Sequence, residues 1–200
     1  MAYSASTGFR LRKNLYGLQT EGQQLSVRVA NSTTLKLGDA VRLNTGGFLV
    51  RSAAGEAVLG LITGFRASTT SDAAGVNPFG LGADATGLTL TEDDQIATSS
   101  TNQTRADVYL VGEVTVDPAG ILLFYNDSDG TLARTNIGQY FDVLSGSNQI
   151  DSASASDSNG QFELIEIDPD ADGDASKGLF RVAESQIGGG IDSGTAKIAA

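Results

Sequence analysis

RADVYLVGEVTV, residues 105–116, is the strongest strand pattern in the chain. β-Branched and aromatic residues dominate this run, and such residues favour strands. Asp117-Pro118-Ala119-Gly120 follows, and proline in the second place with glycine in the fourth fits a tight turn. The sequence therefore predicts a hairpin in which residues 121–125 return beside 105–116.

Similar strand patterns lie on both sides of this run. They cover residues 24–30, 39–43, 48–51, 56–66, 88–91, 140–144, 161–167 and 178–184. Asn44-Thr45-Gly46-Gly47 is a hairpin signal, Gly60 and Gly64 predict bulges or bends in a long strand, and residues 131–138 have room for a helical turn. The fold class expected is all-β, a β-barrel or sandwich of about ten short antiparallel strands with long polar loops.

The domain organisation follows from the polar segments between these strands. Residues 1–22 are expected to form an extended N-terminal arm, residues 23–184 a β domain, and residues 185–200 a flexible C-terminal tail. The β domain can also be divided into two small subdomains, 23–92 and 105–184. Two polar loops, 67–86 and 145–160, are long for a compact domain.

The composition removes most catalytic chemistries. The chain of 200 residues has no Cys and no His, so disulfides, thiolate nucleophiles and a Ser-His-Asp triad are absent. A hydrolase that uses only carboxylates remains open, but no two acidic residues stand out as its pair. We expect no enzyme activity and no catalytic residues.

Charge is unevenly distributed along the chain. The net charge is −11, yet residues 1–66 carry eight basic and three acidic side chains, which leaves the rest of the chain at −16. This asymmetry predicts two electrostatic faces, one of which docks on a partner; the alternative is that acidic loops only maintain solubility. We expect no nucleic-acid binding, because most of the chain repels phosphate, and no membrane binding, because no apolar run is long enough to span a bilayer.

One acidic segment resembles part of a calcium loop. Asp168, Asp170 and Asp172 alternate, and Gly173 takes the sixth place, as in the first half of such a loop. The twelfth place should hold a bidentate Glu and instead holds Leu179. These residues are therefore a weak calcium candidate, and the alternative is an acidic hairpin tip between two strands. No other cofactor is expected.

The first 22 residues contain apolar and basic side chains that would be idle in a free tail. We expect them to form a partner-binding arm, with Phe9, Arg10, Arg12, Lys13, Leu15 and Tyr16 as the contact residues.

A family resemblance starts from Leu35-Lys36-Leu37-Gly38-Asp39-Ala40-Val41-Arg42-Leu43 and the later stretch Ala54-Gly55-Glu56-Ala57-Val58-Leu59-Gly60-Leu61-Ile62. These stretches resemble the small β-barrel decoration, or cement, proteins of tailed-bacteriophage heads. Gly8-Phe9-Arg10, Asn14-Leu15-Tyr16-Gly17, Val108-Tyr109-Leu110 and the run Gly138–Leu144 fit the same pattern.

This resemblance implies a structural virion protein that stabilises the capsid by binding the major capsid protein. It further implies a homo-oligomer, a trimer or dimer, on the capsid surface of the virion after synthesis in the host cytoplasm. Two other hypotheses stay open: another virion component such as a head-fibre or tail subunit, and a carbohydrate-binding or adhesion β module.

Overall fold

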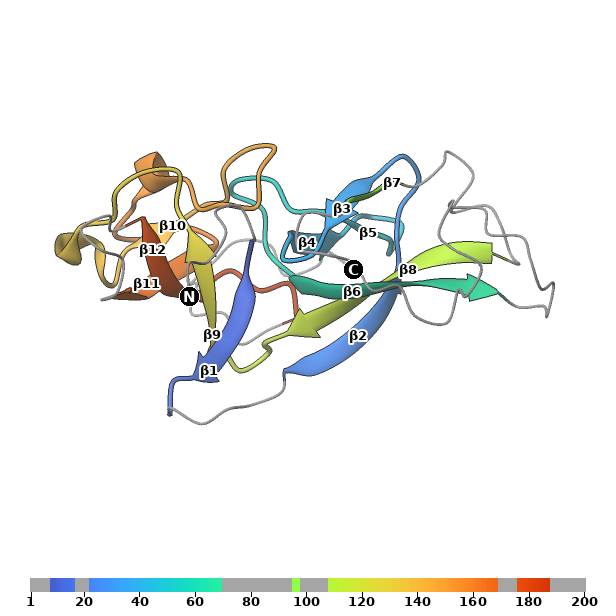
Figure 1. The fold of residues 1–200 in the computed structure, drawn as a ribbon, viewed down its shortest axis with the longest axis horizontal. Helices are drawn as coiled ribbons and strands as arrows, with labels where there is room; N and C mark the ends of the chain where they lie inside the picture. Colours follow the sequence, from blue (N-terminus) through green and yellow to red (C-terminus); the bar gives the residue numbers. More distant parts are fainter. Residues whose placement is uncertain (1–7, 17–21, 70–94, 98–107, 169–175, 188–200) are drawn as a thin grey trace.

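The computed structural model describes residues 8–16, 22–69, 95–97, 108–168 and 176–187. Across these ranges the chain is all-β, as predicted, with helix limited to two 3₁₀ turns, Arg134–Asn136 and Ser152–Ser154 (Figure 1). The strands form two five-stranded antiparallel sheets and one two-stranded sheet. The arrangement is sandwich-like, and of the two predicted architectures the closed barrel is wrong.

Sheet A has the order β1-β9-β12-β11-β10. Its strands are β1 (Arg10–Asn14), β9 (Leu122–Asp127), β12 (Lys177–Val182), β11 (Phe162–Ile167) and β10 (Tyr140–Phe141). Sheet B has the order β2-β8-β6-β4-β5. Its strands are β2 (Gln23–Arg28), β8 (Val108–Val116), β6 (Gly60–Thr69), β4 (Ala40–Leu43) and β5 (Leu49–Arg51). The small sheet pairs β3 (Thr34–Lys36) with β7 (Gln95–Ala97).

The predicted hairpin after residue 116 is wrong. β8 pairs with β2 and β6 in sheet B, whereas β9 pairs with β1 and β12 in sheet A. The Asp117–Gly120 turn exists, with the Gly120 N–H donating to the Asp117 carbonyl oxygen at 3.2 Å. It carries the chain from one sheet to the other, and β8 therefore belongs with the strands of the first half of the chain.

Several local predictions are confirmed. β4 and β5 pair across Asn44–Gly47, and β11 pairs with β12 across the acidic segment. A register shift between Ile62 and Gly64 places a bulge in β6. A 3₁₀ turn lies within residues 131–138. The predicted strand at 88–91 lies outside the described residues.

Other segments differ from the prediction. β1, β3 and β7 lie where no strand was predicted; β1 pairs with β9, and β3 pairs with β7. Ser185 to Ile187 were assigned to a flexible tail, but Ser185 bridges to Val58, and the Gln186 carboxamide bonds both to the Leu43 N–H (2.7 Å) and to the Leu43 carbonyl (3.2 Å).

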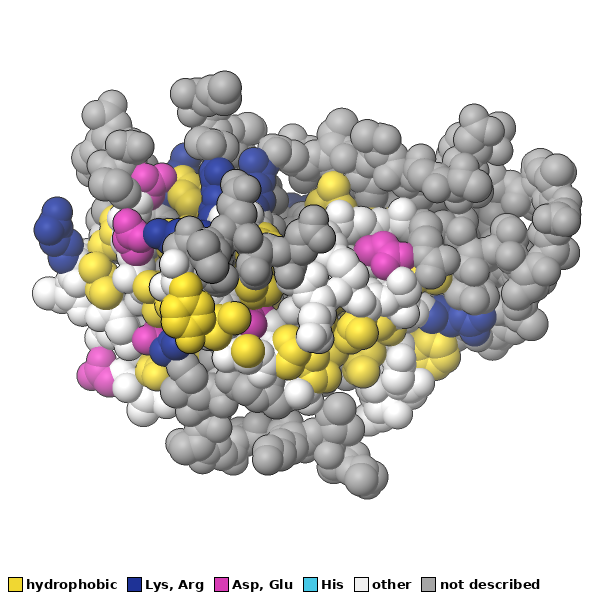
Figure 2. All heavy atoms as spheres, turned by 90° about the horizontal axis from the view of Figure 1, so that it is seen from below, with side chains coloured by type: hydrophobic (Ala, Val, Ile, Leu, Met, Phe, Trp, Pro, Cys, Tyr) yellow, Lys and Arg dark blue, Asp and Glu magenta, His cyan; other side chains and the backbone are white. Residues whose placement is uncertain are grey.

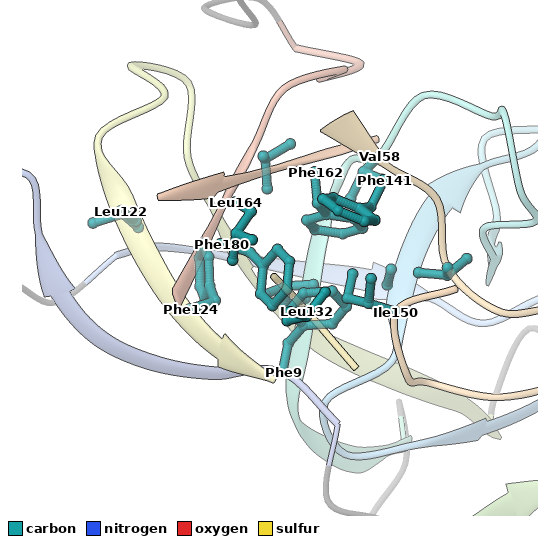
Figure 3. Close-up of a cluster of buried hydrophobic side chains, with 14 residues drawn as sticks. Phe9, Val58, Leu122, Phe124, Leu132, Phe141, Ile150, Phe162, Leu164 and Phe180 are labelled. Atoms are coloured by element: carbon teal, nitrogen blue, oxygen red, sulfur yellow. The ribbon is translucent and has the colours of Figure 1, made fainter. Parts of the chain in front are cut away.

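Two hydrophobic clusters share the strands of sheet B. Along β6, Leu61 belongs to the first cluster and Ile62 to the second; along β4, Ala40 and Val41 divide in the same way. Strand side chains alternate between faces, so both faces of this part of sheet B are buried. The first cluster also contains most of the inward side chains of sheet A (Figure 3). The sheets therefore pack on each other through the first cluster.

Gln161 joins the two sheets by hydrogen bonds. Its side chain has no exposed surface. Its amide nitrogen lies 3.0 Å from the Ser52 hydroxyl, 2.8 Å from the Ala53 carbonyl and 2.6 Å from the Glu56 carbonyl, all in the loop that connects β5 to β6. Its amide oxygen accepts from the Val143 N–H at 2.9 Å. The Gln161 carboxamide thus bonds both to the loop between β5 and β6 and to the backbone of Val143, which follows β10 of sheet A.

Candidate functional site

The predicted contact residues lie on β1 and the turn that follows it, and the structure divides them into three groups. Phe9 points inward, where it stacks on Phe162 with ring centroids 4.2 Å apart and meets Phe180 edge-on at 6.5 Å (Figure 3). Only 4% of Phe9 is exposed. Phe9 is therefore a core residue of its own chain, and its assignment as a partner-binding residue is wrong for this reason.

The basic residues of β1 contact sheet A. The Arg12 guanidinium lies 5.3 Å from the centre of the Tyr125 ring, a cation–π distance. Lys13 forms an ion pair with Glu166 at 3.2 Å. Both side chains of that pair are close to half exposed, so the pair adds little stability. Arg10 lines a small cleft between β1 and sheet B. Arg12 and Lys13 thus reach from β1, the edge strand of sheet A, to side chains of β9 and β11 in the same sheet.

Leu15 and Tyr16 are the exposed members of the set. Tyr16 has 76% of its surface exposed and Leu15 has 41%. The Leu15 N–H donates to the Ile121 carbonyl at 2.8 Å, which fixes the end of β1 beside the turn that joins the two sheets. We call Leu15 and Tyr16 the β1 tip. Figure 2 shows hydrophobic side chains gathered on the face seen from below, the side on which β1 and β2 lie in Figure 1.

The Gly38-Asp39 pair, which carried much of the resemblance, has a structural role here. Gly38 has φ +77°, a left-handed conformation that favours glycine. Its carbonyl accepts from the Phe9 N–H at 3.0 Å, and its N–H donates to the Ile62 carbonyl at 2.8 Å. This corner therefore links β1, at its Phe9 end, to sheet B.

Asp39 is a fully buried carboxylate with an uneven set of partners. Its Oδ2 accepts from the Lys36 N–H at 2.9 Å and from Arg51 Nη2 at 2.6 Å. Its Oδ1 is buried and has no hydrogen-bond partner in the part of the chain that the structure describes. Burial raises the pKa of Asp39 above its ordinary value, and the Arg51 guanidinium opposes that shift.

The calcium candidate is only partly described. Asp168 accepts a hydrogen bond from the Tyr125 hydroxyl at 2.8 Å, while Asp170 and Asp172 lie outside the described residues. Burial, and then the neighbouring Asp168, raise the pKa of Tyr125, so this hydroxyl stays protonated and acts as a donor. Within the described ranges, no three acidic side chains are grouped so that they could hold a metal ion.

A cleft of about 240 Å³ separates β1 from the β3–β4 corner and β6. Its lining is mostly apolar, with Phe9, Leu11, Leu37 and Phe124 among its walls, and Arg10 and Thr63 supply its polar side chains. Ligand pockets are commonly larger, about 300–1,000 Å³. This space is the seam along which β1 docks, and its walls carry no carboxylate that would serve as an acid or base.

The sequence reasoning missed two kinds of residue. Gln161 and Asp117 are buried polar residues. Gln161 bonds to backbone atoms about 100 positions away in the sequence, and Asp117 bonds to N–H groups across its own turn. Neither residue belongs to a periodic pattern from which its burial could be predicted. Leu25, Val27 and Val29 alternate in the predicted strand 24–30, and Val27 and Val29 belong to or pack on the second cluster. Leu25, however, is 38% exposed, since β2 is the edge strand of sheet B.

No protein-family model matches the chain, and neither the curated proteins nor the solved structures contain a match. In the described ranges, no helix is long and apolar enough to cross a membrane. The fold itself defines the class: over the residues that the structure describes, this is an all-β, sandwich-like protein.

Proposed function

We propose that this protein is a structural virion component that decorates a bacteriophage capsid, stabilises it by binding the major capsid protein, and catalyses no reaction. The observation that carries the proposal is the β1 tip, where an exposed leucine and an exposed tyrosine stand on a strand fixed at both ends. Tyrosine is enriched at protein interfaces, because its ring supplies contact area at a low cost in conformational entropy.

The support beneath the β1 tip favours binding over catalysis. β1 is anchored by the buried Phe9 at its start and by the Leu15–Ile121 hydrogen bond at its end. A rigid support lowers the entropy lost on binding. The buried carboxylates Asp39 and Asp117 bond to this chain's own N–H groups and to Arg51, so they are occupied with holding turns. The family resemblance supplies the identity of the partner.

The direct test mixes the purified protein with undecorated capsids encoded by the same genome. Electron microscopy should show stoichiometric added density on the shell, and co-sedimentation should give the affinity. Capsids that stay bare under several ionic conditions would refute decoration. Binding to a purified tail or head-fibre instead would favour another virion role, and specific signals on a glycan array would favour an adhesion module.

Two variants localise the contact. The double substitution Leu15→Ser and Tyr16→Ser should weaken capsid binding by about 10- to 100-fold, in the range of an interface hot spot. Ile137→Ser removes another exposed apolar side chain, 48% exposed beyond the 3₁₀ turn, and should leave binding unchanged. Equal binding by both variants would exclude the β1 tip as the contact.

A further inference from the structure

The four edges of the two large sheets are not equally protected. β10 has two residues and β5 has three, so each is too short to pair with another strand for long. β1 is longer, but it carries Arg10, Arg12 and Lys13, and its register shifts between Leu11 and Lys13. Short length, charge and bulges are the usual devices that stop edge strands from pairing with other chains.

The first five residues of β2 lack all of these devices. β2 has six residues, and its pairing with β8 runs without a register shift from Gln23 to Arg28. Its first five residues, QQLSV, contain no charge and no proline. Residues 23–26 are exposed, and no strand of the described part of the chain pairs with this edge.

The direction of the backbone groups of β2 follows from one hydrogen bond. The Val29 N–H donates to the Leu110 carbonyl at 2.9 Å, in register with the Arg28–Val111 pair. Backbone groups alternate in direction along an antiparallel strand, so the odd-numbered residues bond to β8. The N–H and C=O groups of Gln24 and Ser26 therefore point to the open edge.

The side chains of these two residues are already fixed. Gln24 Nε2 donates to Thr115 Oγ1 at 2.6 Å, and the Ser26 hydroxyl donates to Glu113 Oε2 at 2.6 Å. Both partners lie on β8, so the outer strand is held flat against its neighbour. An incoming strand would meet a preordered template and lose less entropy on pairing.

We infer that β2 pairs antiparallel with β2 of a second copy of this chain, which joins two copies of sheet B into one ten-stranded sheet. The two-fold axis passes beside Leu25, so that Leu25 faces Leu25 of the second copy. Gln24 then lies opposite Ser26 of that copy, and the outward N–H and C=O groups bond to each other. In this register no charged residue faces a like charge, because the segment Gln23–Val27 is neutral.

The second copy fits this edge better than an unrelated strand because the pairing is self-complementary. Leu25 is the large apolar side chain of β2 that is left exposed, and its face continues into the second cluster through Val27. Directly opposed side chains in a non-hydrogen-bonded antiparallel pair lie close together. The two leucines thus cover each other. This inference does not depend on capsid binding, since the β1 tip and the edge of β2 are different surfaces.

The absence of native cysteine allows a direct test. Cα atoms in a non-hydrogen-bonded antiparallel pair lie about 4.5 Å apart, within the range that a disulfide spans. The variant Leu25→Cys should therefore form a disulfide-linked dimer under mild oxidation, at least about tenfold faster than Ile137→Cys, because pairing raises the effective thiol concentration. Equal rates for the two variants would overturn the proposal.

A second variant tests the same contact without forming a covalent bond. Sedimentation of the wild-type chain over a concentration series should show a monomer–dimer equilibrium. Leu25→Lys places two ammonium groups opposite each other and should weaken dimerisation by at least about tenfold. Ile137→Lys makes the same chemical change elsewhere and should leave dimerisation unchanged. A wild-type chain that stays monomeric up to about 1 mM, the millimolar limit of weak association, would refute the β2 dimer.

Discussion

Asp39 shows how a short motif acts through one buried carboxylate. Its Oδ2 closes the corner between β3 and β4 by accepting from the Lys36 N–H, and it also holds Arg51 of β5. Burial raises the pKa of this carboxyl, so the folded protein binds the Asp39 proton more tightly than the unfolded chain does. Linkage then ties the free energy of unfolding to pH.

The sign of this effect gives a prediction. The stabilisation from the Asp39 proton is present at low pH, and it is lost as the pH rises above 3.8, the ordinary pKa of an Asp carboxyl, through the raised pKa of the folded state. Asp39→Asn cannot titrate. The free energy of unfolding of the wild type, minus that of Asp39→Asn, should therefore fall as the pH rises above 3.8. Denaturant unfolding at several pH values measures this difference, and a difference that rises with pH would contradict the prediction.

The corner at Asp39 shows which features the sequence could predict and which it could not. Gly38 and Asp39 belong to the stretch that carries the family resemblance, and in the structure they form a corner with Gly38 in a left-handed conformation. The same stretch did not reveal that Phe9 would bond to this corner, because that contact joins residues 29 positions apart in sequence. The alternation of apolar residues predicts which side chains are buried, but it does not predict which of the two hydrophobic clusters they join.

At the scale of elements, the Asp117–Gly120 turn decides which sheet each strand joins. The Asp117 carboxylate accepts from the N–H groups of Ile121 at 3.1 Å and Leu122 at 2.7 Å, and it is 4% exposed. These bonds direct the chain away from β8 and into sheet A. Turn residues indicated a tight turn correctly, but a turn motif does not state whether the strands on either side pair with each other.

Removing the Asp117 carboxylate should destabilise the folded protein. Asp117→Ala leaves two N–H groups without their acceptor, one of them in the buried Leu122, and should lower the free energy of unfolding by about 2–3 kcal/mol. Asp129→Ala is the matched control, because the exposed Asp129 accepts from one N–H, that of Ser152. It should cost about 1 kcal/mol or less. Urea unfolding of both variants measures these values. Equal losses would show that the two Asp117 bonds stabilise the fold no more than the single Asp129 bond does.

β1 is the element whose role the structure changes most. Phe9→Ala removes a ring that stacks on Phe162 and should lower the free energy of unfolding by about 3–5 kcal/mol. Tyr16→Ala removes an exposed ring and should change it by about 0.5 kcal/mol or less. Thermal unfolding measures both. A Phe9→Ala variant that unfolds at the same temperature as the wild type would mean that Phe9 does not anchor β1, and that it stays available to a partner, as the sequence suggested.

Across the whole molecule, the sequence predicted the number of strands well, but it predicted poorly which sheet each strand joins. Strand patterns are local, and turns and alternating residues reveal them. The assignment of β1 to sheet A and β2 to sheet B depends on contacts with β9 and β8, which lie more than 80 residues away. The predicted electrostatic faces stay a prediction, because much of the acidic excess belongs to segments outside the described residues.

The two sheets are coupled by the first hydrophobic cluster, which contains side chains of both sheets, and by Gln161. β4 and β6 contribute to both hydrophobic clusters, and the segment 184–186 bonds to sheet B after leaving β12. We therefore expect the described part of the chain to unfold as one cooperative unit, although it has two clusters. Gln161 is the best place to test this, because its amide is the buried link between β11 and the loop after β5.

Gln161→Leu keeps the size of the side chain and removes every one of its hydrogen bonds. The Val143 N–H then loses its acceptor, and the carbonyls of Ala53 and Glu56 each lose one of their two donors, which should lower the free energy of unfolding by about 2–4 kcal/mol. Amide hydrogen exchange should show the same loss of protection in β8 of sheet B as in β9 of sheet A. Gln149→Leu, whose side chain bonds at 3.4 Å to Ser147, should cost less than about 1 kcal/mol. Loss of protection confined to sheet A would mean that the sheets unfold separately, because a single cooperative unit transmits a local loss to every strand.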